Sequence, residues 1–177
     1  MADTPLDMAE LSGLLTSDEH ADEAGSFKTV AAGKYESTLD MRQTLTGGED
    51  SLKSLVGRQY AKVSFPVKNT EGRKTGRVNF NISWIEKRTA KGFQDSAYSL
   101  YNQFVVALGM KGKEVPDVLQ AIMEYPFVFT VTEQYKDTTP DGAVVYKDVT
   151  PANRDAIVRG AFKRYNNVTG ISKVKVA

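Results

Sequence analysis

The sequence predicts a mainly β protein with a helical insert. Apolar and polar residues alternate, as in half-buried strands, in the stretches 57–69, 78–84 and 125–137. In residues 96–108 the apolar spacing changes to three and four residues, which is the period of an amphipathic helix. Turn-forming residues join successive strands, so we expect antiparallel hairpins and not the alternating strands and helices of a doubly wound sheet.

The first two strands are expected at residues 33–45 and 57–69. Tyr35, Leu39 and Met41 form the apolar face of the first. In the second, the inward residues are Ala61, Val63, Phe65 and Val67, and the outward residues are Arg58, Tyr60, Lys62 and Ser64. Pro66 has no backbone N–H to donate, which predicts an edge or a bulge at this end of the strand.

The third strand is expected at 78–84, after a hairpin loop at 69–76 that is rich in turn-forming residues. Trp84 continues its apolar face, which favours packing in the core. Asn79 and Asn81 occupy the opposite face although asparagine is a poor strand former. Their presence there indicates a polar surface that faces a ligand.

Helices and further strands follow. A helix is expected from Ser96 to Leu108, closed by Gly109, and a shorter one at 116–123. A strand at 125–137 then turns at 139–142 into a strand at 143–149. Thr150 and Pro151 are typical of an N-cap and first helical residue. They predict a C-terminal helix whose apolar face contains Ile157, Val158, Ala161, Phe162 and Tyr165. A short closing strand is expected at 171–176.

Three strands, a helix and two more strands follow one another in the order of the oligonucleotide-binding (OB) barrel. We therefore expect an OB-like five-stranded barrel with a helix between strands 3 and 4 and an added C-terminal helix. A β-sandwich stays open as an alternative, because it requires only a different count of the strands.

Charge divides the chain into an acidic arm and a basic domain. Residues 1–26 hold seven acidic residues and no Lys or Arg, whereas residues 27–177 hold all 23 Lys and Arg and 15 acidic residues. Near-helical spacing predicts a short helix from Pro5 to Leu15, followed by an acidic linker. We expect a single OB-like domain over 27–177 that binds a polyanion and an arm that competes with it. The alternative is a solvated tail on a mildly basic domain.

Composition excludes several classes of function. There is no cysteine, and the single histidine, His20, lies in the acidic linker, so thiolate sites, histidine triads and histidine metal clusters are absent. No glycine-rich stretch matches a phosphate-binding loop. We expect no enzyme, no metal and no cofactor. Because there is neither a run of about eighteen apolar residues nor a signal-peptide pattern, we expect a cytoplasmic protein that does not bind membranes.

Binding of single-stranded nucleic acid needs cations for the phosphates and exposed rings on which bases stack. The predicted strands and their loops carry both kinds of residue. The candidate nucleic-acid-binding residues are Arg58, Tyr60, Lys62, Arg73, Lys74, Arg77, Lys87, Arg88, Phe93, Tyr135, Tyr146 and Lys147. Each also has an ordinary structural interpretation, since tyrosines are common on half-exposed sheets and cations on solvated hairpin tips.

The stretches GKYESTL, GRQYAKVSFPV, GRVNFNIS, SLYNQFVVALGM and YPFVFTVTEQYKD occur in this order. Over residues 27–150 this arrangement resembles phage-type single-stranded DNA-binding proteins of OB fold. The resemblance implies sequence-tolerant coating of single-stranded DNA during phage replication or recombination in the host cytoplasm. It also implies homo-oligomers and replication or recombination proteins as partners. Such proteins usually end in an acidic tail, whereas here the end, ISKVKVA, is basic and the acidic segment is N-terminal.

A second hypothesis comes from the same features. The helical arm from Pro5 to Leu15 and the basic C-terminus also suit a phage virion or assembly protein whose β-domain self-associates through its arm. Under this hypothesis the protein is located in the virion.

Overall fold

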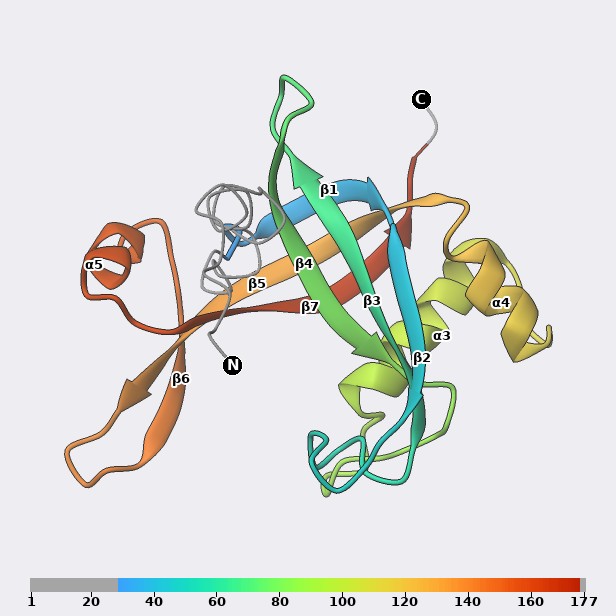
Figure 1. The fold of residues 1–177 in the computed structure, drawn as a ribbon, viewed down its shortest axis with the longest axis horizontal. Coiled ribbons are helices and arrows are strands. Elements are labelled where there is room, and N and C mark those ends of the chain that lie inside the picture. Colours follow the sequence, from blue (N-terminus) through green and yellow to red (C-terminus); the bar gives the residue numbers. More distant parts are fainter. Residues whose placement is uncertain (1–28, 176–177) are drawn as a thin grey trace, which may run out of the picture.

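The computed structural model describes residues 29–175 (Figure 1). Strands predominate over this range, and three helices accompany them. The strands are β1 (Gly33–Thr38), β2 (Met41–Thr46), β3 (Gln59–Lys68), β4 (Lys74–Ile82), β5 (Pro126–Thr138), β6 (Val144–Asp148) and β7 (Arg164–Lys173). The helices are α3 (Ser96–Leu108), α4 (Val115–Ala121) and α5 (Arg154–Arg159). The predicted mainly β fold with a helical insert is confirmed, whereas the predicted arm at 1–26 lies outside the described residues.

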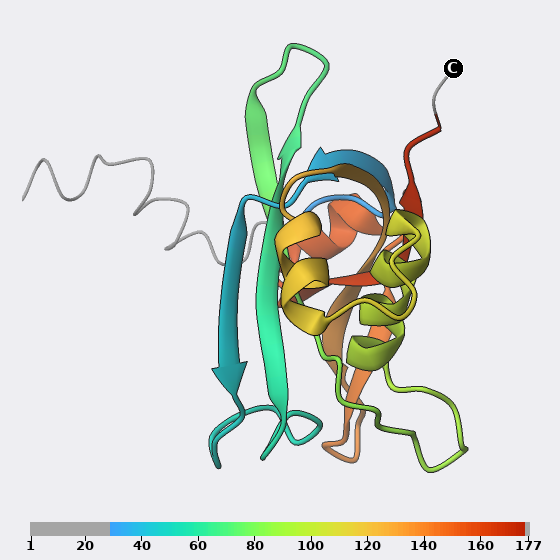
Figure 2. The same ribbon diagram turned by 90° about the vertical axis from the view of Figure 1, so that its right-hand side faces the viewer.

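The strands form two antiparallel sheets that enclose the core between them (Figures 1 and 2). In one sheet β3 lies between β2 and β4. In the other sheet the long strand β5 is central. β7 pairs with one edge of β5 from Phe127 to Tyr135, while β1 and β6 pair with successive parts of the other edge.

The strand predicted at 33–45 is divided between the two sheets. β1 pairs with β5, and β2 pairs with β3. Leu39 and Asp40 separate them: the Leu39 side chain enters the core, and the Asp40 N–H donates to the Ser64 carbonyl oxygen at 3.1 Å. One continuous stretch of alternating residues therefore serves both sheets by bending at these two residues.

The two sheets do not close into the predicted five-stranded barrel. β4 and β7 lie close together, but within residues 29–175 no hydrogen-bond ladder joins them. We call this boundary the β4–β7 seam. Each strand flanking the seam therefore pairs along one edge only, β4 with β3 and β7 with β5, and this leaves the barrel open at the seam.

Phenylalanines from both sheets and α3 fill the core. Phe65 on β3 and Phe129 on β5 stack with ring centroids 4.0 Å apart, and Phe104 of α3 meets the edge of Phe127 at 4.9 Å. The period-two and helical patterns therefore identified these core faces correctly. Trp84, half-buried, packs against the same core and edge-on against Tyr101, as predicted.

Helix α3 has the boundaries predicted for it. The Asp95 carboxylate caps its N-terminus by accepting from the Tyr98 N–H. Gly109 ends it with a φ of 65°, a left-handed conformation that favours glycine. Helix α4 also agrees with prediction, within two residues at its end.

The C-terminal helix is shorter than predicted. It begins after Asn153 instead of at Pro151, and Gly160 follows its last residue. Of the predicted apolar face only Ile157 is buried, and Tyr165 lies in β7 instead of the helix. Residues 151–153 form a turn instead: the Thr150 carbonyl accepts from the N–H groups of Asn153 and Arg154, and the Thr150 N–H donates to Asn153 Oδ1 at 2.7 Å.

A buried glutamate of the second sheet binds arginines from α5 and from the start of β7. Glu133 of β5 is only 2% exposed. Its carboxylate accepts from Arg154 Nε of α5 at 3.1 Å and lies 3.8 Å from Arg164 Nη1 at the start of β7. The Thr29 hydroxyl also donates to it. Four segments of the chain therefore meet at one carboxylate.

The chain enters the domain at the β4–β7 seam. The Asn166 side chain binds both backbone groups of Val30: the Val30 N–H donates to Oδ1 at 2.9 Å, and Nδ2 donates to the Val30 carbonyl at 2.8 Å. The Val30 side chain is buried against Gly76 of β4, where any β-carbon would lie 2.7 Å from Val30 Cγ1. Val30 thus fills one end of the seam.

Candidate nucleic-acid interface

Two of the predicted outward-facing residues are buried. Arg58, which precedes β3, and Tyr60 are each 5% exposed. Tyr60 packs with Leu55 and Ala97, from the loop 47–58 and from α3. The prediction that Arg58 and Tyr60 lie on an exposed strand face is therefore wrong, because the loop and the start of α3 cover that end of the sheet.

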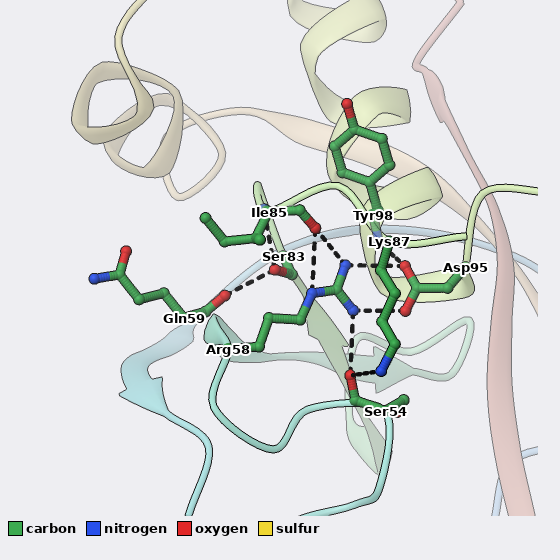
Figure 3. Close-up of polar contacts among 8 residues, drawn as sticks. All are labelled: Ser54, Arg58, Gln59, Ser83, Ile85, Lys87, Asp95 and Tyr98. Atoms are coloured by element: carbon green, nitrogen blue, oxygen red, sulfur yellow. Dashed lines mark hydrogen bonds and ion pairs between the residues drawn. The ribbon is translucent and has the colours of Figure 1, made fainter. Parts of the chain in front are cut away.

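The Arg58 guanidinium donates hydrogen bonds to neighbouring groups of the same chain (Figure 3). It donates to both Asp95 carboxylate oxygens, at 2.6 and 3.0 Å. It also donates to the carbonyl oxygens of Ile85, at 3.2 Å, and Ser54, at 3.4 Å. Lys87 Nζ donates to the same Ser54 carbonyl at 3.1 Å. Arg58 therefore joins two loops to the start of α3 and has no free donor directed at a phosphate.

Asp95 is held in its charged form by these contacts. Burial on its own raises the pKa of the Asp95 carboxyl, but hydrogen bonds from Arg58 and from the Tyr98 N–H bring the pKa below its ordinary value of 3.8. The folded protein therefore binds a proton at this site less readily than the unfolded chain does.

This lowered pKa predicts how stability depends on pH. The contribution of the Asp95 carboxylate is fully present above the unfolded pKa, near 3.8, and is lost as the pH falls through the folded value. Asp95→Asn should therefore be less stable than the wild type at pH 7, and the gap should narrow at pH 3. Urea unfolding of the wild type and of Asp95→Asn at pH 7 and at pH 3 measures the difference in free energy of unfolding between the two proteins. An equal gap at both would contradict this role.

The remaining predicted residues lie apart from one another. The tip of the β3–β4 hairpin, the loop 83–95 and the β5–β6 hairpin point in different directions (Figure 1). The first region carries Arg73, Lys74 and Arg77, the second carries Lys87, Arg88 and Phe93, and the third carries Tyr135, Tyr146 and Lys147. Lys62 lies on β3. These candidate residues therefore do not form one wall, because the hairpins project from opposite ends of the sheets (Figure 1).

Several of these cations already contact an acidic residue. Ion pairs at the protein surface are weak because solvent screens their charges, so a phosphate can replace the acid at little cost. The pairs are Arg73–Glu71 at 3.7 Å, Arg77–Asp40 at 2.8 Å, Arg88–Glu86 at 3.0 Å and Lys147–Asp137 at 2.8 Å. Among the residues that the structure describes, no acidic side chain pairs with Lys62 or Lys74.

One face of the second sheet places two tyrosine rings, one exposed and one half-buried, beside cations. Tyr146 is 57% exposed and packs edge-on against Tyr165, with ring centroids 5.8 Å apart. Lys163 Nζ lies 5.4 Å from the centre of the Tyr165 ring. Tyr146 pairs with Lys136 and Tyr165 with Gln134, so their side chains share a face. We call these five residues the tyrosine face.

Sequence reasoning found only part of this face. It selected Tyr146 but assigned Tyr165 to a helix, and it selected Tyr135, which lies on the opposite face of β5. There the Tyr135 ring packs edge-on against Phe162, with centroids 5.3 Å apart. The pairing register that unites Tyr146 with Tyr165 depends on β7, whose full length the sequence did not predict.

A groove of about 700 Å³ opens along the β4–β7 seam, beside the tyrosine face. No Asp, Glu, Lys or Arg contributes to its lining. Its amide side chains are Asn79, Asn81, Gln103, Gln134, Asn166 and Asn167. Asn79 and Asn81 on β4 were the one signal in the sequence for this groove.

The two walls of the groove differ in their hydrogen bonds. On the wall formed by β5 and β7 the amides are fixed: Asn167 Nδ2 donates to Gln134 Oε1 at 3.1 Å, and Gln134 Nε2 donates to Asp148 Oδ1 at 3.1 Å. On the β4 wall, no group within residues 29–175 hydrogen-bonds to the side chains of Asn79 or Asn81. One wall is rigid, and the other offers free donors and acceptors.

Comparison with known proteins finds no matching family model, no matching curated protein and no matching solved structure. Across residues 29–175, no helix combines the length and the apolar character that crossing a bilayer requires. The same residues bring together no group of three or more acidic or histidine side chains suited to a metal ion.

Proposed function

We propose that this protein binds single-stranded DNA with little sequence preference, and that the tyrosine face is the centre of the binding surface. The observation that carries the proposal is the exposed Tyr146 ring, which packs against the half-buried Tyr165 ring with Lys163 beside it. Base stacking on an aromatic ring contributes about 1–3 kcal/mol per base and tolerates any base, because every base has a π-face.

The charges around the groove support the same proposal. Lys62 on β3 lies directly opposite Asn81 of the groove in the β3–β4 register. Lys136 and Lys163 lie on the other side, on the tyrosine face. Cations thus flank an uncharged groove, an arrangement in which phosphates stay outside while bases turn inward. Such binding should weaken steeply with salt through counterion release.

The order of the elements supports an OB-like architecture. β1 and β2 act as one bent strand that contributes to both sheets, and β3, β4, α3, β5 and β7 follow in the order of an OB barrel. In this interpretation β6 and α5 are an insertion in the last connection, and the insertion carries Tyr146. Together with the resemblance to phage proteins, this supports a role in phage replication or recombination.

Substitution of Tyr146 tests the proposal. Tyr146→Ala should weaken binding to an oligo(dT) about tenfold, which corresponds to the lower part of the range for one stacked base. Fluorescence anisotropy with a labelled 30-mer, at two salt concentrations, measures it. Tyr125→Ala is the matched control, because Tyr125 is 53% exposed but lies at the opposite end of β5.

Three results would contradict the proposal. The first is that the wild type does not bind oligo(dT) at low salt. The second is that it binds duplex DNA as tightly as the single strand. The third is that Tyr125→Ala weakens binding as much as Tyr146→Ala does. An oligo(rU) of the same length, run in parallel, establishes whether DNA is preferred over RNA.

A further inference from the structure

We infer that the groove along the β4–β7 seam binds nucleobases by their hydrogen-bonding edges, so that the protein recognises bases and not only the phosphate backbone. This inference rests on the proposed function. It assigns the groove a ligand, the Watson–Crick edge of an unpaired base, and assigns Asn79 and Asn81 the role of contacting it.

The chemistry of the lining favours a base over a phosphate. The lining of the groove contains no cationic side chain that would bind a phosphate. It also contains no carboxylate that would repel the hydrogen-bond acceptors of a ligand. An amide side chain offers both a carbonyl acceptor and N–H donors, and base edges present both kinds of group. A volume of about 700 Å³ also lies within the range of small-molecule sites.

Asn79 and Asn81 are suited to the contact because they are free. Asparagine is depleted in strands, yet β4 places two of them on its outer face beside the seam. Neither side chain has a hydrogen-bond partner among residues 29–175. Across the groove, Asn167 and Gln134 hold each other in place. A base that enters thus meets a fixed wall and an adaptable one.

The position of the groove connects it to the tyrosine face. Asn167 lies two residues after Tyr165 and on the same face of β7, and Gln134 pairs directly with Tyr165. A strand whose base stacks on Tyr146 or Tyr165 therefore carries the neighbouring base toward the groove.

The free amide side chains also explain how recognition of base edges is compatible with binding that has little sequence preference. Rotation of the Asn79 and Asn81 side chains exchanges donor for acceptor, so the same two residues match different bases. The groove should consequently accept any base with a free edge and disfavour one whose edge is blocked.

An oligonucleotide of N3-methylthymidine provides the test, because methylation blocks the Watson–Crick edge and leaves the π-face available for stacking. The wild type should bind this oligonucleotide about tenfold more weakly than oligo(dT), as expected when one or two hydrogen bonds to a base are lost. The double variant Asn79→Ala/Asn81→Ala should bind both oligonucleotides with equal affinity. Tyr146→Ala should keep the discrimination while binding both more weakly.

Gln43→Ala is the matched control, since Gln43 is an exposed amide on β2 of the same sheet and does not line the groove. It should discriminate as the wild type does, and circular dichroism confirms that each variant is folded. If the wild type binds both oligonucleotides equally, edge recognition is wrong and the proposed function stands. If the wild type binds neither, the proposed function itself is wrong.

Discussion

Replacing Arg58 with alanine is expected to lower the free energy of unfolding by about 3–5 kcal/mol, the usual effect of removing one partner of a buried ion pair. Asp95, whose side chain is 12% exposed, would keep its charge without the guanidinium that neutralises it. The carbonyl oxygens of Ile85 and Ser54 would also lose a donor. Urea unfolding followed by circular dichroism measures the change.

Arg88→Ala is the matched control for this experiment. Arg88 also pairs with an acid, Glu86 at 3.0 Å, but the side chains of both residues are more than half exposed. Its removal should change stability by no more than about 0.5 kcal/mol. Arg58→Lys should fall between the two, because lysine restores the charge but not the planar fork that meets both Asp95 oxygens. Equal effects of Arg58→Ala and Arg88→Ala would refute the structural role of Arg58.

Replacing Glu133 with alanine should also be severe, with a loss of about 3 kcal/mol or more. The substitution leaves Arg154 and Arg164 without the carboxylate that they share and removes the acceptor of the Thr29 hydroxyl. Since α5 buries only Ile157, this helix should open first. Urea unfolding measures the global effect, and hydrogen exchange of residues 154–159 measures the local one.

Glu36→Ala controls for the loss of a carboxylate as such. Glu36 lies on β1, which pairs with the same strand β5, but its side chain is exposed. It should leave both stability and the exchange of α5 close to those of the wild type. Unchanged exchange of α5 in Glu133→Ala would show that the helix does not depend on this carboxylate.

Local patterns predicted the elements well where local chemistry decides them. Asp95 and Gly109 determine both ends of α3, and the alternation around Phe65 and Phe80 identified the core faces of β3 and β4. These features depend on residues that are neighbours along the chain, so they can be predicted from the sequence alone.

Features that depend on distant segments were not predictable in the same way. Alternation shows that Tyr60 and Lys62 share a face, but it does not show that Leu55 and Ala97 cover Tyr60 and leave Lys62 exposed. The sequence predicts one strand across Leu39, but the structure has two strands there. The residues before the bend pair with β5, and the residues after it pair with β3.

In the candidate site, too, the features set by neighbouring residues were predictable and those set by distant segments were not. The type of Asn79 and Asn81 and their position on a strand predicted a ligand-facing surface, and the structure places both residues in the lining of the groove. The groove that they line needs β7 as its second wall, and β7 lies about ninety residues further along the chain. Tyr165 was assigned to a helix because its spacing from Ile157 and Phe162 fits a helical period, and Gly160 interrupts that helix first.

The central position of β5 has a consequence for synthesis on the ribosome. The strands β2, β3 and β4 are consecutive and can pair as soon as they emerge, whereas β1, which is made earlier, pairs with residues 126–131. Contacts of such large sequence separation form slowly because a long loop must close first. The nascent chain thus displays an unpaired β1 until β5 has been translated, and during this interval it is most exposed to aggregation and to chaperones.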